Sequence, residues 1–175
     1  MKIIVIGSGG RENILVEKLS NSYNSVYCIG EYINPDIKAA TKEYFTCSFK
    51  NIQDLLTICN KIKPDFIIIG PETLLETNFV NECKLRDYPC IAPYKELAQL
   101  ETSKVFTRYL LNTIVKMQYN PQFIYLHNGK TQNEIKKTIT SFVDNNKVDI
   151  VIKVDGLAGG KGVFVQGDHF NTLDE

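Results

Sequence analysis

The segment GSGGRE at residues 7–12 is the first stretch of the chain whose residue types and spacing could do chemistry. It follows an apolar run at residues 3–6 and opens an expected helix. Such a turn points backbone N–H groups and the positive end of the helix at an anion, and its glycines let a phosphate approach the backbone. The segment favours a phosphate or phosphosugar site, while a dinucleotide site and a purely structural tight turn remain open alternatives.

Glu12 disfavours the dinucleotide alternative. A dinucleotide fingerprint has a third glycine at this position because helix and strand pack closely there, and a bulky charged side chain conflicts with that packing. Glu31, at the end of the expected second strand, could still bind a ribose. Titration with NAD would distinguish a dinucleotide-binding domain from the other interpretations.

A second candidate site is the segment GPE at residues 70–72, which follows the apolar run at residues 66–69. Ligands of open α/β sheets bind at the carboxyl ends of the strands. The Glu72 carboxylate can accept hydrogen bonds from sugar hydroxyls at that edge. The alternative is that Glu72 lies in the first turn of the next helix and only complements the helix dipole.

The segment VIKVDGLAGGKGV at residues 151–163 is the third candidate. Lys153 lies on an otherwise apolar strand, where an ammonium group is costly unless an anion or a carboxylate pairs with it. The glycines that follow can close over phosphates, and Lys161 adds positive charge. A Walker A loop would have Ser or Thr after this lysine, where Gly162 stands, so the segment is not a P-loop. The alternative is a flexible hairpin with one solvated lysine.

Short apolar runs alternate with helical patterns through the first half of the chain. The runs at residues 3–6 and 66–69 are apolar at every position, which is typical of parallel strands buried on both faces. Asn51 can cap a helix whose apolar stripe extends over residues 52–62. Alternating strands and helices predict an open, doubly wound α/β domain over about residues 1–93. The expected strands are residues 3–6, 26–29, 44–49, 66–69 and 90–92.

After Pro93 the pattern changes, and a second unit begins near there. Helical stripes extend over residues 105–110 and 135–143, and strands are expected at residues 123–126, 150–154 and 163–165. The first of these strands follows a proline and is expected at a sheet edge. The short, glycine-rich connection between the last two strands predicts a hairpin and not a crossover. The second unit is therefore expected to be α+β.

The composition of the 175 residues is typical of a globular protein, with 43% apolar and 23% charged residues. Lys plus Arg and Asp plus Glu number 20 each, so the sequence lacks the basic excess that indicates a nucleic-acid partner. No apolar run approaches the ~20 residues that span a bilayer, and no export signal is expected. Five cysteines without a C-x-x-C pair indicate a reducing cytoplasm, and two histidines argue against a Cys/His zinc site.

Four segments together resemble phosphoribosylamine–glycine ligase, also called glycinamide ribonucleotide synthetase. In the family's order and spacing they are IIVIGSGGREN at residues 3–13, GPE at 70–72, QLETSKVF at 99–106 and VIKVDGLAGGKGV at 151–163. The resemblance spans essentially the whole chain. It implies a Rossmann-like pre-ATP-grasp domain with a parallel sheet at residues 1–101. It also implies that residues 102–175 are the incomplete α+β start of an ATP-grasp domain.

The resemblance also implies a function. Enzymes of this family use ATP to join glycine to 5-phosphoribosylamine, forming glycinamide ribonucleotide in de novo purine biosynthesis. By resemblance, phosphoribosylamine would be bound by Gly9, Gly10, Arg11 and Glu72. ATP would be bound by Lys104, Lys153, Gly159, Gly160, Lys161 and Gly162. The family further implies Mg²⁺ or Mn²⁺, whose carboxylate ligands are expected beyond residue 175, and no catalytic side chain is assigned within the chain.

Three departures from the family pattern lie near the expected sugar-phosphate cleft, where they bear on substrate identity. The family usually has His at Asn13, Pro at Leu74 and a Pro-Gly-Asn turn at residues 30–32. A complete ligase of this kind is more than twice as long, so this chain alone is expected to be inactive. The alternative is a non-catalytic module that binds a nucleotide or phosphosugar in the same cleft. The length of the intact open reading frame distinguishes the two.

Overall fold

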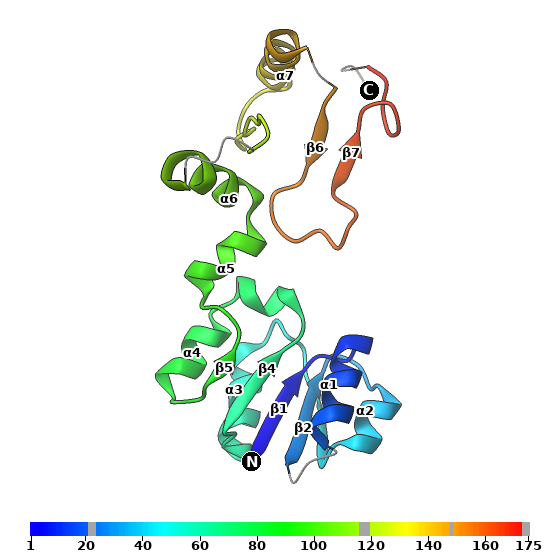
Figure 1. Cartoon of the computed structure of the whole chain (residues 1–175), viewed down its shortest axis with the longest axis vertical. Helices are drawn as coiled ribbons and strands as arrows, with labels where there is room; N and C mark the ends of the chain where they lie inside the picture. Colours follow the sequence, from blue (N-terminus) through cyan, green and yellow to red (C-terminus); the bar gives the residue numbers. More distant parts are fainter. Residues whose placement is uncertain (21–23, 116–119, 148, 173–175) are drawn as a thin grey trace. The chain divides into compact units, whose positions relative to one another are not determined.

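The computed structural model describes residues 1–20, 24–115, 120–147 and 149–172 (Figure 1). Contacts between residues divide the chain into two compact units, Met1–Thr102 and Ser103–Glu175. The first unit is an α/β unit built on a parallel sheet, and the second combines helices with a small antiparallel hairpin.

A five-stranded sheet forms the centre of the first unit. Its strands are β1 (Lys2–Ile6), β2 (Ser25–Gly30), β3 (Glu43–Thr46), β4 (Phe66–Ile69) and β5 (Cys90–Ile91). They pair in parallel in the order β3-β2-β1-β4-β5, so the strand order reverses at β1. This topology confirms the open, doubly wound α/β architecture, although β3 and β5 end earlier than the sequence predicts.

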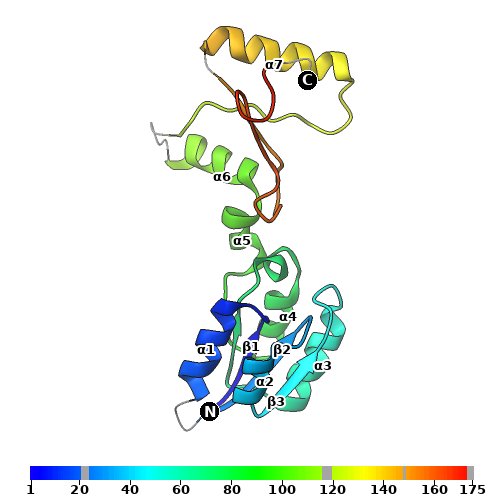
Figure 2. The same ribbon diagram turned by 90° about the vertical axis from the view of Figure 1, so that its right-hand side faces the viewer.

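Helices cover both faces of the sheet (Figures 1 and 2). One face packs against α1 (Gly10–Ser20) and α2 (Pro35–Ala40), and the other against α3 (Ile52–Ile62) and α4 (Phe79–Leu85). The first core contains Ile3, Val5, Val16, Val26, Cys28 and Ile37. The second contains Ile4, Ile6, Ile29, Leu55, Ile67 and Phe79. Because alternate residues of β1 enter opposite cores, its apolar run is buried at every position.

The α3 helix begins and ends where its sequence predicts. Asn51 Oδ1 accepts a hydrogen bond from the Asp54 N–H at 3.3 Å, and the apolar stripe is buried from Leu55 to Ile62. Lys63 adopts a left-handed conformation with φ of 52° and donates its N–H to the Cys59 carbonyl. This left-handed residue ends the helix.

A short 3-10 helix, η1 (Glu72–Glu76), follows β4, and α5 (Lys95–Thr102) is the last helix of the first unit. The structure records all five cysteines as free thiols. None of the described helices is both long enough and apolar enough to cross a membrane.

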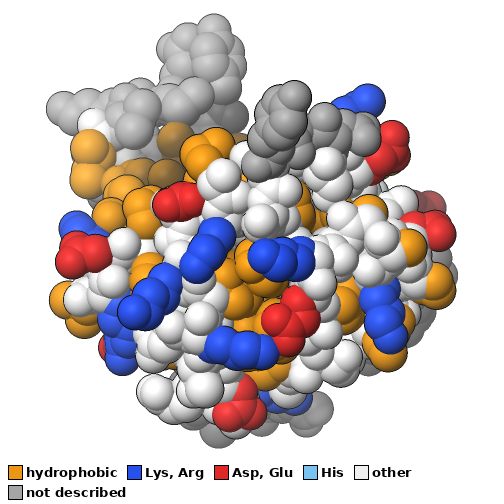
Figure 3. Space-filling model, turned by 90° about the horizontal axis from the view of Figure 1, so that it is seen from below, with side chains coloured by type: hydrophobic (Ala, Val, Ile, Leu, Met, Phe, Trp, Pro, Cys, Tyr) orange, Lys and Arg blue, Asp and Glu red, His pale blue; other side chains and the backbone are white. Residues whose placement is uncertain are grey.

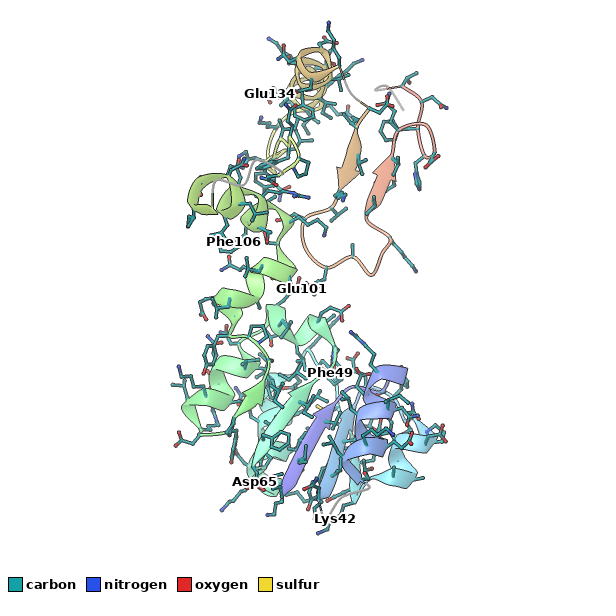
Figure 4. All side chains as sticks on the ribbon, viewed as in Figure 1. Lys42, Phe49, Asp65, Glu101, Phe106 and Glu134 are labelled. Atoms are coloured by element: carbon teal, nitrogen blue, oxygen red, sulfur yellow. The ribbon has the colours of Figure 1, made fainter. Side chains whose placement is uncertain are left out.

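Lysine and arginine side chains gather over the face of the first unit that carries the amino-terminal ends of the strands (Figure 3). There, the Lys2 N–H donates to Asp65 Oδ2 at 2.7 Å, and Lys42 Nζ lies 5.9 Å from the centre of the Tyr27 ring. Figure 4 shows Lys42 and Asp65 at this edge and Phe49 at the opposite, carboxyl-terminal edge. This charged face, which also carries Asp and Glu side chains, therefore lies away from the glycine turn that follows β1.

The second unit contains α6 (Lys104–Leu110), the π-helical turn η2 (Leu111–Val115), α7 (Gln132–Asn146), β6 (Val151–Lys153) and β7 (Val163–Val165). Antiparallel pairing of Ile152 with Phe164 confirms the predicted hairpin. The predicted edge strand at residues 123–126 is wrong, since these residues have no regular secondary structure. A strand needs a neighbour for its backbone hydrogen bonds, and β6 and β7 pair only with each other among the described residues.

Candidate functional site

The two glycine-containing segments of the first unit meet at the carboxyl-terminal edge of the sheet. β1 and β4 are neighbours with Ile6 opposite Ile69, and the Gly70 N–H donates to the Ile6 carbonyl at 2.9 Å. The turn at residues 7–10 therefore begins beside residues 70–72. In open α/β sheets, ligands bind at this point, where the strand order reverses.

Arg11 and Glu72 face each other at this edge. Arg11 Nη2 lies 3.4 Å from Glu72 Oε2 and 3.4 Å from the Gly70 carbonyl oxygen. The two side chains are 75% and 45% exposed, so their ion pair adds little stability and is accessible to a ligand. Together with Glu101 they line a pocket, which also contains Ile69, Pro71, Leu75 and Pro93. The structure thus brings two of the four predicted substrate-binding residues into one pocket.

The other two predicted residues, Gly9 and Gly10, lie at the amino end of α1, and neither is among the described residues that line this pocket. The Gly9 N–H donates to Glu12 Oε2 at 2.7 Å, so a side chain of the protein already bonds this amide. From the sequence, Glu12 is expected to obstruct close packing of helix and strand. In the structure Glu12 is instead buried beneath the turn and only 5% exposed.

Glycines make the space that Glu12 occupies. A Cβ at Gly7 would lie 2.5 Å from Glu12 Cγ, and a Cβ at Gly70 would lie 2.5 Å from Glu12 Cδ. Glu12 Oε1 is buried without a hydrogen-bond partner among the described residues, and Arg11 Nε lies 4.0 Å from it. The sequence signal for this arrangement is the combination of a glutamate in the first helical turn with glycines after two neighbouring strands.

Hydrogen bonds from the β2 side of the sheet fix the turn. The Ser8 hydroxyl donates to the Tyr32 carbonyl at 3.0 Å, and the Tyr44 hydroxyl donates to the same carbonyl at 2.6 Å. Asn34 Nδ2 donates to the Ser8 carbonyl at 3.0 Å. Burial raises the pKa of the Tyr44 hydroxyl, which therefore stays a neutral donor at physiological pH.

Glu31 lies at the same edge, directly after β2. Its Oε1 accepts a hydrogen bond from the Phe49 N–H at 3.1 Å, and Figure 4 shows Phe49 at this edge. One oxygen of the carboxylate therefore fixes the segment that precedes α3. A role of Glu31 in binding a ribose stays a prediction.

Cys28 supports the turn from the interior of the sheet. Its thiol donates to the Gly7 carbonyl at 3.3 Å, and the side chain is fully buried. Burial raises the pKa of the Cys28 thiol to about 12, so the sulfur stays protonated and continues to donate.

In the second unit, the predicted ATP-binding residue Lys104 contacts the start of the glycine-rich loop. Lys104 Nζ donates to the Gly156 carbonyl at 2.7 Å. Asp155 accepts hydrogen bonds from the Val105 N–H and the Ser103 hydroxyl, both at 3.1 Å. Asp155 thereby holds the amino end of α6 against the loop. This role of Asp155 was not predicted from the sequence, although Asp155 immediately precedes the first glycine of the loop.

The loop between β6 and β7 requires glycine at several positions. Gly159 and Gly160 have φ of 54° and 79°, a left-handed conformation that other residues rarely adopt. The Lys161 N–H donates to the Ala158 carbonyl at 3.0 Å, and a Cβ at Gly162 would lie 2.7 Å from Ala158 Cβ. The four loop residues predicted to bind ATP, Gly159 to Gly162, therefore form one defined turn.

Lys153 lies on β6 opposite Val163 and is exposed, as are Val151 and Ile152. The expectation that its ammonium group lies in an apolar setting and needs a paired anion is therefore wrong for the described residues. The physical reason is that a two-stranded hairpin leaves the faces of β6 open to solvent. An ATP-binding role for Lys153 rests on its position in the hairpin and not on burial.

The described residues contain no group of three His, Cys, Asp or Glu side chains that could hold a metal ion. Asp155, the carboxylate at the start of the glycine-rich loop, is bonded to the amino end of α6. The described residues therefore do not form a site for the divalent cation that the family implies.

A doubly wound sheet with a pocket where its strand order reverses, followed by a lysine- and glycine-rich hairpin, is the arrangement expected of a pre-ATP-grasp domain followed by the start of an ATP-grasp domain. Residues 1–101 match the family "Phosphoribosylglycinamide synthetase, N domain", and the chain belongs to this family. The phosphoribosylamine–glycine ligase of Methanocella arvoryzae is 34% identical over 179 residues, covering 100% of this chain and 39% of the relative. The corresponding ligase of Pyrococcus furiosus is 31% identical, covering 100% of this chain and 38% of the relative. The chain thus spans less than half the length of these relatives.

Solved structures share the fold. Phosphoribosylamine–glycine ligase from Thermotoga maritima superposes with a TM-score of 0.62 at 23% identity, covering 99% of this chain and 37% of that one. N5-carboxyaminoimidazole synthetase from Staphylococcus aureus, complexed with ADP, superposes with a TM-score of 0.70 at 14% identity, covering 99% and 42%. At these identities the likeness concerns the fold alone.

Proposed function

We propose that the chain supplies the phosphoribosylamine site and part of the ATP site of a ligase that forms glycinamide ribonucleotide in de novo purine biosynthesis. The observation that carries this proposal is the pocket of Arg11 and Glu72, at the reversal point of a sheet that matches the family. Because the relatives are much longer, we assign substrate binding to this chain and not the complete reaction.

In this proposal residues 1–101 form the phosphoribosylamine-binding domain. Glu72 accepts hydrogen bonds from the sugar hydroxyls, and Arg11 donates hydrogen bonds to oxygen atoms of the ligand. The N–H groups of Gly10 and Arg11 lie in the first turn of α1, where no carbonyl one turn earlier can bond them. They are therefore available to a polar ligand group, beside the Gly9 N–H that Glu12 already bonds.

Residues 102–175 would form the first part of the ATP-grasp domain. The contact between Lys104 and the loop supports this assignment, because it places a lysine beside the turn formed by Gly159, Gly160, Lys161 and Gly162. Backbone N–H groups of such a turn and nearby lysines are the usual ligands of nucleotide phosphates. Lys153 is the further lysine on the hairpin.

In the complete enzyme, ATP would phosphorylate the glycine carboxylate, and the amine of phosphoribosylamine would displace phosphate from the acyl phosphate. This chemistry needs positioning and charge neutralisation more than a side-chain nucleophile. In the complete enzyme, Mg²⁺ or Mn²⁺ would contribute part of this charge neutralisation. The five free thiols fit the reducing cytoplasm in which this reaction is expected.

Calorimetric titration with ribose 5-phosphate tests the first site. Glu72→Gln removes a charged acceptor while keeping the shape of the side chain, so the affinity should fall about tenfold, the equivalent of ~1.4 kcal/mol. Glu43→Gln is the matched control, because Glu43 is exposed to a similar extent and pairs with Lys61 at the other edge of the sheet. Equal affinities of the Glu72 variant and the control would contradict the proposed site.

Titration with ATP tests the second site. Lys153→Met removes the charge and keeps the apolar stem, so the affinity for ATP should fall roughly 10–150-fold if Lys153 binds a phosphate. Lys137→Met, on the exposed surface of α7, is the control for a general change in charge. An unchanged affinity for ATP in the Lys153 variant would remove Lys153 from the proposed site.

A further inference from the structure

We propose that Glu12 decides which part of a ligand the β1–α1 turn accepts, excluding phosphate and admitting groups that donate hydrogen bonds, such as an amine or a sugar hydroxyl. The identity of the admitted group rests on the proposed function, whereas the exclusion of phosphate does not. For phosphoribosylamine, the amine or hydroxyl end would then face the turn, and the phosphate would point away from it.

The first observation is that the turn already holds an anion of the protein. The Gly9 N–H donates to Glu12 Oε2 at 2.7 Å, a charge-assisted hydrogen bond. A phosphate that approached the same amide would have to displace this carboxylate and remain beside it. Two anions compete for one donor, and the internal one is tethered to the helix.

The second observation is that Glu12 is built into the sheet. Its side chain is 6% exposed and fills the space left by Gly7 and Gly70, which follow two different strands. A glutamate at the third position of a helix often bonds the amide at the helix start, which is a capping role. That role needs no burial and no glycine on a neighbouring strand. The packing around Glu12 therefore indicates more than a cap.

The third observation is the unpartnered oxygen. Glu12 Oε1 is buried without a hydrogen bond among the described residues, and a Cβ at Gly70 would collide with it. Gly70 and Arg11 both line the pocket, so Oε1 lies directly behind the pocket wall. Because Oε1 is buried, with Arg11 Nε at 4.0 Å, a ligand in the pocket does not bond it directly. The charge of the carboxylate acts through the wall, where it favours an amine or hydroxyl donor over a phosphate.

The charges around the pocket act in the same direction. Arg11 is the cation of the pocket lining, whereas Glu72 and Glu101 line it with carboxylates and Glu12 lies behind it. A phosphate placed here would face three carboxylates and one guanidinium. A cationic amine or neutral hydroxyl would meet acceptors on both sides.

The test compares Glu12→Gln with Glu134→Gln by amide NMR and calorimetry, using inorganic phosphate and D-ribose as separate probes of the full chain. Both glutamates bond the N–H at the start of their helices, but Glu134 is exposed in the other unit, so it is the matched control. The wild-type chain should show no saturable phosphate shift at the Gly9 and Gly10 amides. Glu12→Gln should bind phosphate there at least tenfold more tightly and ribose more weakly, and Glu134→Gln should change neither.

Phosphate affinities that are equal in the wild-type chain and in Glu12→Gln would overturn the proposal, because Glu12 would then be only a helix cap. Thermal melts report that capping role separately. If Glu12→Gln does not fold, the wild-type titration still decides, since saturable phosphate binding at the Gly9 amide contradicts exclusion. Failure of ribose 5-phosphate to bind anywhere would instead count against the proposed function, because the phosphate comparison does not depend on it.

Discussion

The two units of the chain bury apolar side chains to very different extents. In the first unit, both faces of the sheet are covered, and residues such as Ile4 and Ile67 are 0% exposed. In the described part of the second unit, Ile150 is the buried apolar residue, while Val151 and Phe164 are 49% and 45% exposed. A parallel sheet with helices on both faces forms its own core, whereas a two-stranded hairpin has too few neighbours to do so.

The same contrast appears in two glutamates with the same position in their helices. Glu134 forms a complete capping box with Thr131 on the exposed surface of α7. Glu12 makes the equivalent bond to the Gly9 N–H, but it is enclosed between strands. One local motif therefore serves a solvated helix end in one unit and a buried position beside the proposed ligand pocket in the other.

The largest expected effect comes from matched isoleucine truncations. Ile67→Ala on β4 should lower the free energy of unfolding by ~2–5 kcal/mol, because it removes a fully buried side chain and leaves a cavity. Ile152→Ala on β6, where the side chain is 39% exposed, should change it by less than ~0.5 kcal/mol. Urea denaturation of both variants measures the difference. Equal losses would show that the hairpin is packed as tightly as the sheet.

A pair of glycine substitutions sharpens the comparison within the first unit. A Cβ at Gly70 would meet the Glu12 side chain, so Gly70→Ala should destabilise the chain by ~1–3 kcal/mol. Gly10→Ala meets no atom within 4 Å at the start of α1 and should be neutral or slightly stabilising. Adding Glu12→Ala to Gly70→Ala should recover part of the loss, because the clash is removed. A strictly additive double variant would refute the steric explanation.

In the second unit, Asp155→Ala should weaken the amino end of α6. It removes the acceptor of the Val105 N–H and the Ser103 hydroxyl, with an expected local loss of ~0.5–2 kcal/mol. Faster amide hydrogen exchange at Val105 is the measurement. Asp149→Ala, at an exposed position before β6, is the control and should leave this exchange unchanged.

The smallest effect is the pH dependence of the α7 cap. Hydrogen bonds from the Thr131 backbone and side chain hold the pKa of Glu134 below its usual value. The stabilisation is therefore complete above the unfolded-state pKa, ~4.3 for a free glutamate, and is lost as the pH falls through the lower folded-state pKa. Amide shifts of Thr131 should follow this titration, whereas Glu134→Gln should abolish it. A pH-independent wild-type shift would contradict the capping role.

Most of the first unit could be predicted from the sequence because its signals are local. The apolar run of β1 and the stripe of α3 each match one element, and Asn51 fixes where that helix begins. The shorter β3 could not be predicted, because the side chain of Glu31, directly after the neighbouring strand β2, fixes the segment that follows β3. The false strand at residues 123–126 had the right composition but no partner strand.

The site was predicted less completely, because sequence patterns show which residues are present and not which contact each other. Arg11 and Glu72 do meet in one pocket. Glu12 is buried because glycines follow two neighbouring strands. Lys153 was expected to be buried but is exposed, because a two-stranded hairpin does not supply the neighbours that would cover it. Long-range packing of this kind lies outside any single motif.

Because Cys28 bonds the Gly7 carbonyl, the alkylation rate of its thiol reports how often the structure around the glycine turn opens. Only a thiolate reacts with alkylating reagents, and this thiol is fully buried with its pKa raised to about 12. Alkylation of Cys28 therefore requires local unfolding of the sheet. The alkylation rate at Cys28, measured by mass spectrometry, gives the frequency of that unfolding. A ligand that binds at the turn would lower the alkylation rate of Cys28 without contacting the sulfur.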